Sequence, residues 1–221
     1  MNYCIMSNIY PEVFSIPEKM KANCYVFALA PTFRPGGYHK NRTQKARPGD
    51  KCREWRNRPF NFDSCAEFIE RIVCDNKQIV QQVPYKTRHD IIEPRSHLFA
   101  AVLSPKGHTD FHFLRRVPIT SVIRQWRYFR TQMVRNGKPN VIKKFETLRE
   151  KWLANKRPPL FLWIHQRGWS SGGPVIYDAK DNLILDPKSG NYDYGGLNYN
   201  KFCGVFKIKS RTATVTDEYN Y

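Results

Sequence analysis

Two residues of this chain have the types and the settings that thiol chemistry needs. Cys24 follows Asn23 directly, at the start of the apolar run "CYVFALA". Asparagine is a favoured helix N-cap, so a helix is expected to begin here. Backbone N–H groups and the helix dipole favour a thiolate over a thiol at such a position. Cys24 is therefore a candidate nucleophile for attack on a carbonyl carbon.

A thiol nucleophile needs a general base within hydrogen-bond reach, preferably on a rigid strand. His112 stands at the middle of "DFHFLRR", a segment whose composition predicts a strand. Strand alternation places His112 on one face with Asp110, opposite Phe111 and Phe113. The chain has six cysteines and six histidines, so a buried thiol and a core histidine are the alternative interpretation of this pair.

The elements that would position these two residues follow from apolar periodicity. The helix that begins at Asn23 is expected to end before Pro31. "SHLFAAVLS" and "TDFHFLRRV" predict two strands joined by a turn at 105–107. The other expected elements are an amphipathic helix in "SCAEFIERIVCDN", capped by Asp63 or Ser64, strands in "LFLWIHQ", "PVIYD", "NLILD" and "FCGVFKIK", an irregular arm over 1–19 and a flexible tail over 211–221.

The net charge of +18 is concentrated in two segments. A basic loop over 34–58, rich in proline and glycine, holds nine basic and two acidic residues. Residues 115–157 hold thirteen basic and two acidic residues, and the rest of the chain is neutral. A regional excess of this kind is typical of a surface that binds a polyanion.

The second basic segment predicts an inserted helical hairpin over 117–158. Apolar residues recur at helical spacing on both sides of "RNGKPN", in which Gly137 ends the first helix and Asn140 caps the second. Residues 115–145 contain no acidic residue, whereas a solvated helix usually mixes both signs. Nucleic acid is the favoured partner, and an anionic membrane, an acidic protein or an acidic substrate are alternatives. A helix-turn-helix DNA reader is less favoured, because neither helix start gathers Asn or Gln for reading bases.

The residues expected to contact nucleic acid lie in these two segments, where arginine outnumbers lysine. Arginine grips phosphate with two hydrogen bonds, and an exposed aromatic ring stacks on unpaired bases. These residues are Arg42, Lys45, Arg47, Arg53, Trp55, Arg56, Arg58, Arg115, Arg116, Arg124, Arg127, Arg130, Arg135, Lys138, Lys143 and Lys144.

Six short blocks occur along the chain in this order: "NCYVFALA", the Pro-Gly pair at 48 and 49, "DFHFLRR", "RGWSS", "NLILDP" and "LNYNKFCGVFKI". In content and order they resemble blocks of uncharacterised bacterial and viral proteins that are similar to NlpC/P60-type, papain-like cysteine hydrolases. The resemblance covers most of the chain except 117–160. It implies a single domain over 1–221 of the α+β class, with an antiparallel sheet packed on an N-terminal helix. It also implies that Cys24 and His112 occupy the nucleophile and base positions.

One block departs from the pattern of those relatives. Where they have Trp-Ser-His, this chain has Trp169, Ser170 and Ser171. In the papain-like arrangement a polar group on the strand after the base orients the imidazole, and a serine hydroxyl is a weak acceptor for that purpose. Asp186 in "NLILDP" is taken as the third site residue, with His165 as the alternative.

Other classes of site are not expected. The cysteines are irregularly spaced, with neither a zinc-binding pattern nor a disulfide framework, so most are expected to be buried thiols. We expect no metal and no cofactor. No apolar run approaches the roughly 20 residues of a membrane span, and the N-terminus does not read as a signal peptide. A cytoplasmic location follows, in the host cytoplasm if the protein is viral.

Two functions are therefore predicted. The first is a protein that binds RNA or single-stranded nucleic acid through a cationic surface, on a papain-like fold whose active site has degenerated. The alternative is an active cysteine peptidase or amidase with Cys24 as nucleophile, His112 as base and Asp186 or His165 as the orienting group.

Overall fold

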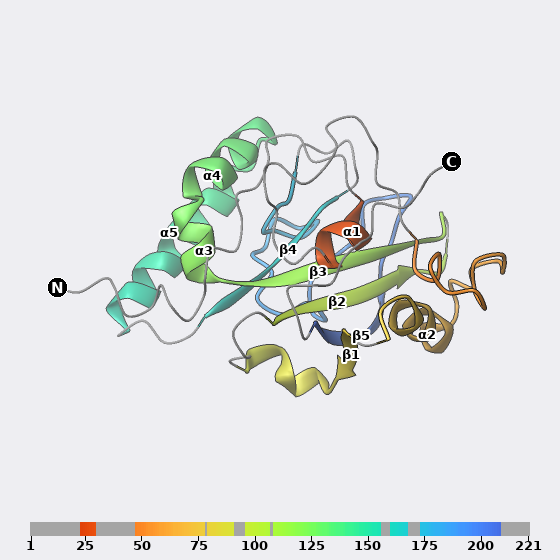
Figure 1. The fold of residues 1–221 in the computed structure, drawn as a ribbon. Coiled ribbons are helices and arrows are strands. Elements are labelled where there is room, and N and C mark those ends of the chain that lie inside the picture. The colour runs from red at the N-terminus through yellow and green to blue at the C-terminus, as the bar shows by residue number, and fades with distance from the viewer. Residues whose placement is uncertain are drawn as a thin grey trace, which may run out of the picture.

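The computed structural model describes residues 23–29, 47–77, 79–90, 96–106, 108–155, 160–167 and 173–208 (Figure 1). It shows an α+β fold built on one antiparallel sheet of five strands in the order β1-β5-β2-β3-β4. The strands are β1 (Val80–Val83), β2 (His97–Ser104), β3 (Asp110–Pro118), β4 (Phe161–His165) and β5 (Lys201–Ile208), and the helices are α1 (Cys24–Leu29), α2 (Cys65–Asp75), the 3₁₀ helix η1 (Tyr85–His89), α3 (Ile119–Arg124), α4 (Trp126–Arg135) and α5 (Pro139–Ala154).

The predicted hairpin of β2 and β3 forms the centre of the sheet. Every residue of β2 is buried, since it lies between β5 and β3. The register pairs Val102 with His112 and Ser104 with Asp110. β4 pairs with β3 only from Leu114 to Pro118. The edge of β3 next to His112 is therefore left free of β4.

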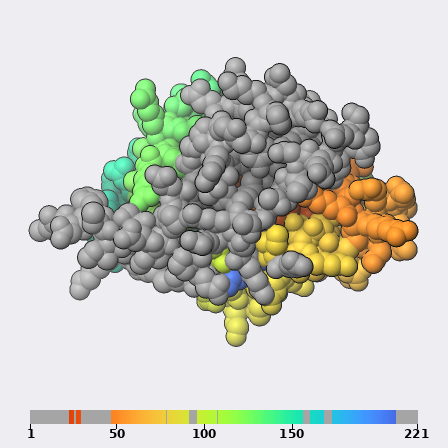
Figure 2. All heavy atoms as spheres, in the orientation of Figure 1, coloured from red at the N-terminus to blue at the C-terminus, as the bar shows by residue number. Residues whose placement is uncertain are grey.

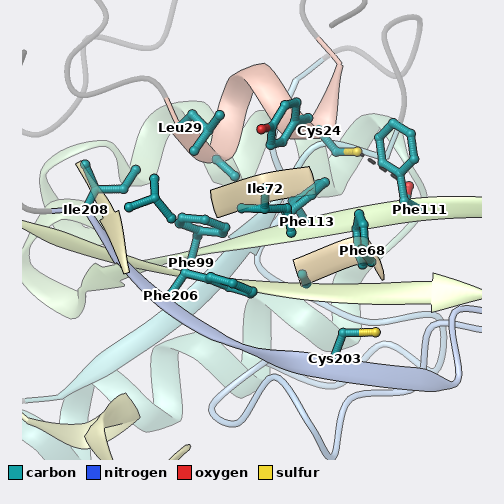
Figure 3. Close-up of a cluster of buried hydrophobic side chains, with 14 of the residues drawn as sticks. Cys24, Leu29, Phe68, Ile72, Phe99, Phe111, Phe113, Cys203, Phe206 and Ile208 are labelled. Carbon is teal, nitrogen blue, oxygen red and sulfur yellow. Dashed lines mark hydrogen bonds between the residues drawn. The ribbon is translucent and has the colours of Figure 1, made fainter. Parts of the chain in front are cut away.

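Helices α1 and α2 cover one face of the sheet, as Figure 3 shows for the side chains between them. Phe68 and Ile72 of α2 are fully buried against Phe99 and Phe113. The start of α2 confirms its predicted cap, since Ser64 Oγ accepts a hydrogen bond from the Glu67 N–H at 3.1 Å.

Helices α3, α4 and α5 lie within the segment predicted as a helical hairpin, with two differences from the expectation. Its first helix is broken at Gln125 into α3 and α4. Its second helix begins at Pro139, one residue before the expected cap, because proline suits the first helical position. Trp126 stacks on Phe145 with ring centroids 4.4 Å apart, so aromatic side chains hold the hairpin together.

Four cysteines that were expected to be thiols form two disulfides. Cys52 is bonded to Cys74, which ties the loop after Pro48 to α2. Cys65 is bonded to Cys203, which ties α2 to β5. The expectation of a chain without disulfides was therefore wrong, because the fold brings together cysteines whose spacing carries no signal.

Several other expectations are corrected. "PVIYD" and "NLILD" form isolated bridges, Val175 with His165 and Tyr177 with Leu183, instead of strands. β1 and η1 were not predicted. Among the described helices, none is both long and apolar enough to cross a bilayer. The arm 1–19 and the tail 211–221 lie outside the described residues.

Candidate active site

His112 and His165 form a hydrogen-bonded pair on neighbouring strands. His112 Nε2 lies 2.7 Å from His165 Nδ1. His165 Nε2 lies 3.0 Å from the Tyr177 carbonyl oxygen, which can only accept. His165 Nε2 therefore carries a hydrogen, and its Nδ1 accepts one from His112 Nε2 when both rings are neutral. This arrangement leaves His112 Nδ1 as the basic nitrogen, with no hydrogen-bond partner among the described residues.

Both imidazoles are held neutral by their surroundings. Burial lowers the pKa of His112 well below its usual value, and the neighbouring His165 lowers it further. Burial also lowers the pKa of His165 to about 4, despite its hydrogen bond to Tyr177. Neutral rings are what the tautomer assignment requires, and a neutral His112 is able to accept a proton.

Cys24 lies at the free edge of β3, beside the backbone of the residues that flank His112 (Figure 3). Its Sγ is 3.7 Å from the Phe111 carbonyl oxygen, and the Phe113 N–H also faces it. Asp110 and Tyr199 interact electrostatically with the thiol. In this geometry the thiol is hydrogen-bonded to the strand and not to the imidazole. The structure thus brings the sequence-predicted nucleophile and base to the same segment of β3.

The protonation state of Cys24 differs from the expectation of a thiolate. Burial, reinforced by the charge of Asp110, raises the pKa of the Cys24 thiol to about 12. Hydrogen bonds from nearby backbone N–H groups oppose this shift but do not overcome it. At neutral pH the resting pair is therefore a thiol and a neutral imidazole.

Asp186 is not part of this site. Its Oδ1 accepts hydrogen bonds from the Tyr85 hydroxyl and the Lys188 N–H, and its Oδ2 accepts one from Arg88 Nε at 3.2 Å. The carboxylate thus fixes η1 to the segment before β5. The choice of Asp186 as third site residue was wrong, and His165, the alternative, takes the contact with His112.

An Asp186→Asn variant is expected to lose about 1 kcal/mol of stability at neutral pH. Burial acts to raise the pKa of Asp186, but the hydrogen bonds from Tyr85 and Lys188 and the charge of Arg88 together lower it. A lowered folded-state pKa contributes stability above the unfolded value, and this contribution is lost as the pH falls through the folded value. Urea unfolding of both proteins at pH 7 and near pH 3 should show the difference shrinking in acid. An equal loss at both pH values would contradict the role of the carboxylate.

His165 was the residue that sequence reasoning failed to choose. The signal that could have found it is the place of His165 in the predicted strand "LFLWIHQ", because the orienting group was expected on a strand after the base. Residues 168–172 lie outside the described part of the chain.

The residues predicted to bind nucleic acid fall into four groups. Arg42 and Lys45 lie outside the described residues. Arg115 and Arg116 are buried in β3, 1% and 4% exposed, so their place on a cationic surface was wrong. The exposed members are Arg47, Arg53, Arg56, Arg58, Arg124, Arg127, Arg130, Arg135, Lys143 and Lys144, while Trp55 and Lys138 are half-buried.

The exposed members do not gather on one surface. Figures 1 and 2 show the described part of the basic loop, 47–58, and the helices α3 and α4 at opposite ends of the molecule. Trp55 also has a structural partner, since the Arg71 guanidinium lies 4.6 Å from its ring centroid. The described residues thus present two separate basic regions.

One group of side chains brings possible metal ligands close together. Cys52, Glu54 and Cys74 bring ligand atoms within 4.8 Å of one another. The two sulfur atoms are bonded to each other in the disulfide, so they are not free to act as thiolate ligands. This group therefore does not fit a metal ion.

Comparison of the chain with family models, with characterised proteins and with solved structures finds no match. We therefore infer the function from the residues of the site.

Proposed function

We propose that this protein is a cysteine hydrolase of papain-like, NlpC/P60-like design that cleaves a peptide or amide bond. Cys24 is the nucleophile, His112 the general base and His165 the group that orients it. The observation that carries the proposal is the chain of hydrogen bonds from His112 through His165 to the Tyr177 carbonyl. It leaves the basic nitrogen of His112 free on the strand segment that Cys24 contacts.

The neutral resting pair supports general-base activation in place of a preformed ion pair. When Cys24 Sγ attacks the substrate carbonyl carbon, its proton passes to His112 Nδ1. His112 then gives this proton to the leaving nitrogen as the C–N bond breaks, and an acyl thioester remains on Cys24. Water attacks the thioester, again with His112 as base, and releases the acid and the thiol. The hydrogen bond to His165 stabilises the imidazolium that forms in both steps.

The proposal is tested with p-nitrophenyl acetate as a small acyl donor. We expect continuous release of p-nitrophenolate, and mass spectrometry of quenched samples should place the acetyl group on Cys24. A Cys24→Ala variant should lose both signals. Cys4→Ser is the matched control, because it removes a thiol from a different part of the chain. Release by the wild type that is no faster than by Cys24→Ala would contradict the proposal.

As a second candidate function, we propose nucleic-acid binding by a surface on α3 and α4. The observation that favours it is the exposure of four arginines on two helices that contain no acidic residue. The apolar sides of these helices are buried, so the guanidinium groups lie on the outward side. RNA or single-stranded nucleic acid remains the proposed ligand.

Four phosphate contacts imply a steep dependence of affinity on salt. The dissociation constant for single-stranded RNA should rise by about fiftyfold between 50 and 200 mM salt, because each neutralised phosphate releases counterions. A quadruple variant should bind RNA more weakly, and its affinity should depend less on salt. Its four substitutions are Arg124→Gln, Arg127→Gln, Arg130→Gln and Arg135→Gln.

The control variant neutralises Arg53 and Arg56, which are exposed at the other end of the molecule. Fluorescence anisotropy with a labelled RNA measures all three proteins at both salt concentrations. Equal weakening by the two variants, or binding that is insensitive to salt, would contradict a binding surface on α3 and α4.

A further inference from the structure

Tyr199 packs on the face of the His112 ring. The two ring centroids are 4.9 Å apart and the planes are tilted by 34°. The tyrosine is 6% exposed, and its hydroxyl donates a hydrogen bond to Asp110 Oδ2 at 2.8 Å. Because Asp110 and His112 lie on the same face of β3, the tyrosine spans both residues. Its hydroxyl is hydrogen-bonded to Asp110, and its ring covers the imidazole of His112.

The segment that carries Tyr199 is itself fixed to the hairpin of β2 and β3. Ser104 Oγ accepts a hydrogen bond from the Asn198 N–H at 3.0 Å. The His108 N–H donates to the Gly196 carbonyl at 3.1 Å, and the Tyr199 N–H donates to the Tyr192 carbonyl at 3.3 Å. Tyr199 is thus held by backbone contacts as well as by its hydroxyl. Its place beside His112 does not depend on the ring contact alone.

The His112 imidazole is consequently restrained from two directions. His165 holds Nε2 at 2.7 Å, with the two ring planes perpendicular at 89°. Tyr199 covers the ring and blocks rotation about the bond that joins the ring to Cβ. A single hydrogen bond would allow the ring to rock about its axis, whereas a hydrogen bond together with a packed face restricts that motion. General-base catalysis requires such restraint, because small displacements of the reacting groups are costly.

We propose that Tyr199 is a positioning residue whose ring holds the His112 imidazole in the orientation and tautomer in which Nδ1 serves Cys24. This inference rests on the proposed hydrolase function. Burial and the Asp110 charge raise the pKa of Tyr199, so its hydroxyl remains a donor to the carboxylate. Asp110 has a second effect on the site, since its charge favours the neutral thiol of Cys24.

The test measures the chemical shifts of the His112 ring nitrogens by ¹⁵N NMR, which needs no substrate. In the wild type we expect the His112 signals of a single neutral tautomer, protonated at Nε2. In Tyr199→Leu both ring nitrogens should move toward averaged shifts, because the ring gains freedom. Tyr199→Phe keeps the ring and should keep the tautomer, which separates the role of the ring from that of the hydroxyl.

Phe206→Leu is the matched control, because it also replaces a buried aromatic ring by leucine but lies in the cluster on the other face of the sheet. It should leave the His112 signals unchanged. Unchanged signals in Tyr199→Leu, or equal changes in Phe206→Leu, would overturn the inference.

Kinetics with p-nitrophenyl acetate complete the test. Tyr199→Leu should lower kcat by about a hundredfold with little change in KM, and Tyr199→Phe should retain most of the rate. If the NMR result holds while the wild type hydrolyses nothing, the proposed function fails and the restraint on His112 stands. If the wild type is active and Tyr199→Leu has the same kcat, the positioning role is overturned although the function is supported.

Discussion

A His112→Gln variant is expected to lower kcat/KM for hydrolysis by about 10²- to 10⁴-fold, while the free energy of unfolding changes little. In the wild type, His165 Nδ1 accepts a hydrogen bond from His112 Nε2. The glutamine amide of the variant can still donate to this nitrogen. No buried acceptor is therefore left unpaired. The amide is not a base, so it cannot take the proton of Cys24. Ester or amide turnover and urea unfolding, measured on the same samples, separate the two effects.

The matched control is His97→Gln. His97 is also buried, its pKa is likewise lowered by burial, and its Nε2 lies 2.9 Å from the Ala28 carbonyl. A glutamine there keeps a donor for this carbonyl without affecting His112, so activity should stay close to the wild-type value. If both variants lose the same factor, the loss comes from the core and not from a general base, and His112 has no catalytic role.

Removal of the Cys65–Cys203 disulfide, by alanine at both positions, is expected to lower the free energy of unfolding by about 5 kcal/mol. Removal of the Cys52–Cys74 disulfide should cost less, about 3 kcal/mol. The difference follows from the sequence separations of 138 and 22 residues, because a longer closed loop removes more entropy from the unfolded chain. Denaturant unfolding of the two double variants measures both values.

Thiol counting checks the same bonds independently. Alkylation of the unfolded, unreduced protein should modify the two cysteines outside the disulfides, Cys4 and Cys24, and leave the other four unmodified. Modification of all six cysteines would contradict both disulfides. Protected cysteines would favour an oxidising compartment, where disulfides persist, over the cytoplasmic location expected from the sequence.

The elements that the sequence predicts well are those stabilised by contacts between near neighbours. The cap of α2 joins Ser64 to Glu67, three residues apart, and the buried side chains of that helix recur at helical spacing. The hairpin of β2 and β3 is also local, since a short turn joins two strongly β-forming segments. In these cases the pattern of side chains and the structure that it favours lie within the same short window.

The contacts of the site are different, because they join distant parts of the chain. Cys24 and Phe111 are 87 residues apart, and His112 and His165 are 53 residues apart. Local sequence patterns could identify a cysteine at the start of a helix and a histidine in a strand. They could not identify the residue to which either side chain is hydrogen-bonded. The sequence favoured Asp186 over His165 as the third site residue, whereas the pairing of β4 with β3 places His165, and not Asp186, beside His112.

The exposure of the basic residues was also only partly predictable from the sequence. The surplus of positive charge and its two segments are properties of the sequence, and the hairpin that holds the second segment was predictable from periodicity. Which arginines reach solvent was not, because Arg115 and Arg116 extend the same charge run but belong to a buried strand.

By itself, then, the sequence determined the types of the candidate reactive residues, the local helices and strands and the location of the charge along the chain. Only the tertiary structure decided which histidine contacts His112, which cysteines are bonded and which basic side chains are exposed. The physical reason is that hydrogen-bonded turns and apolar periodicity act over a few residues, whereas these pairings depend on the order in which the strands join one sheet.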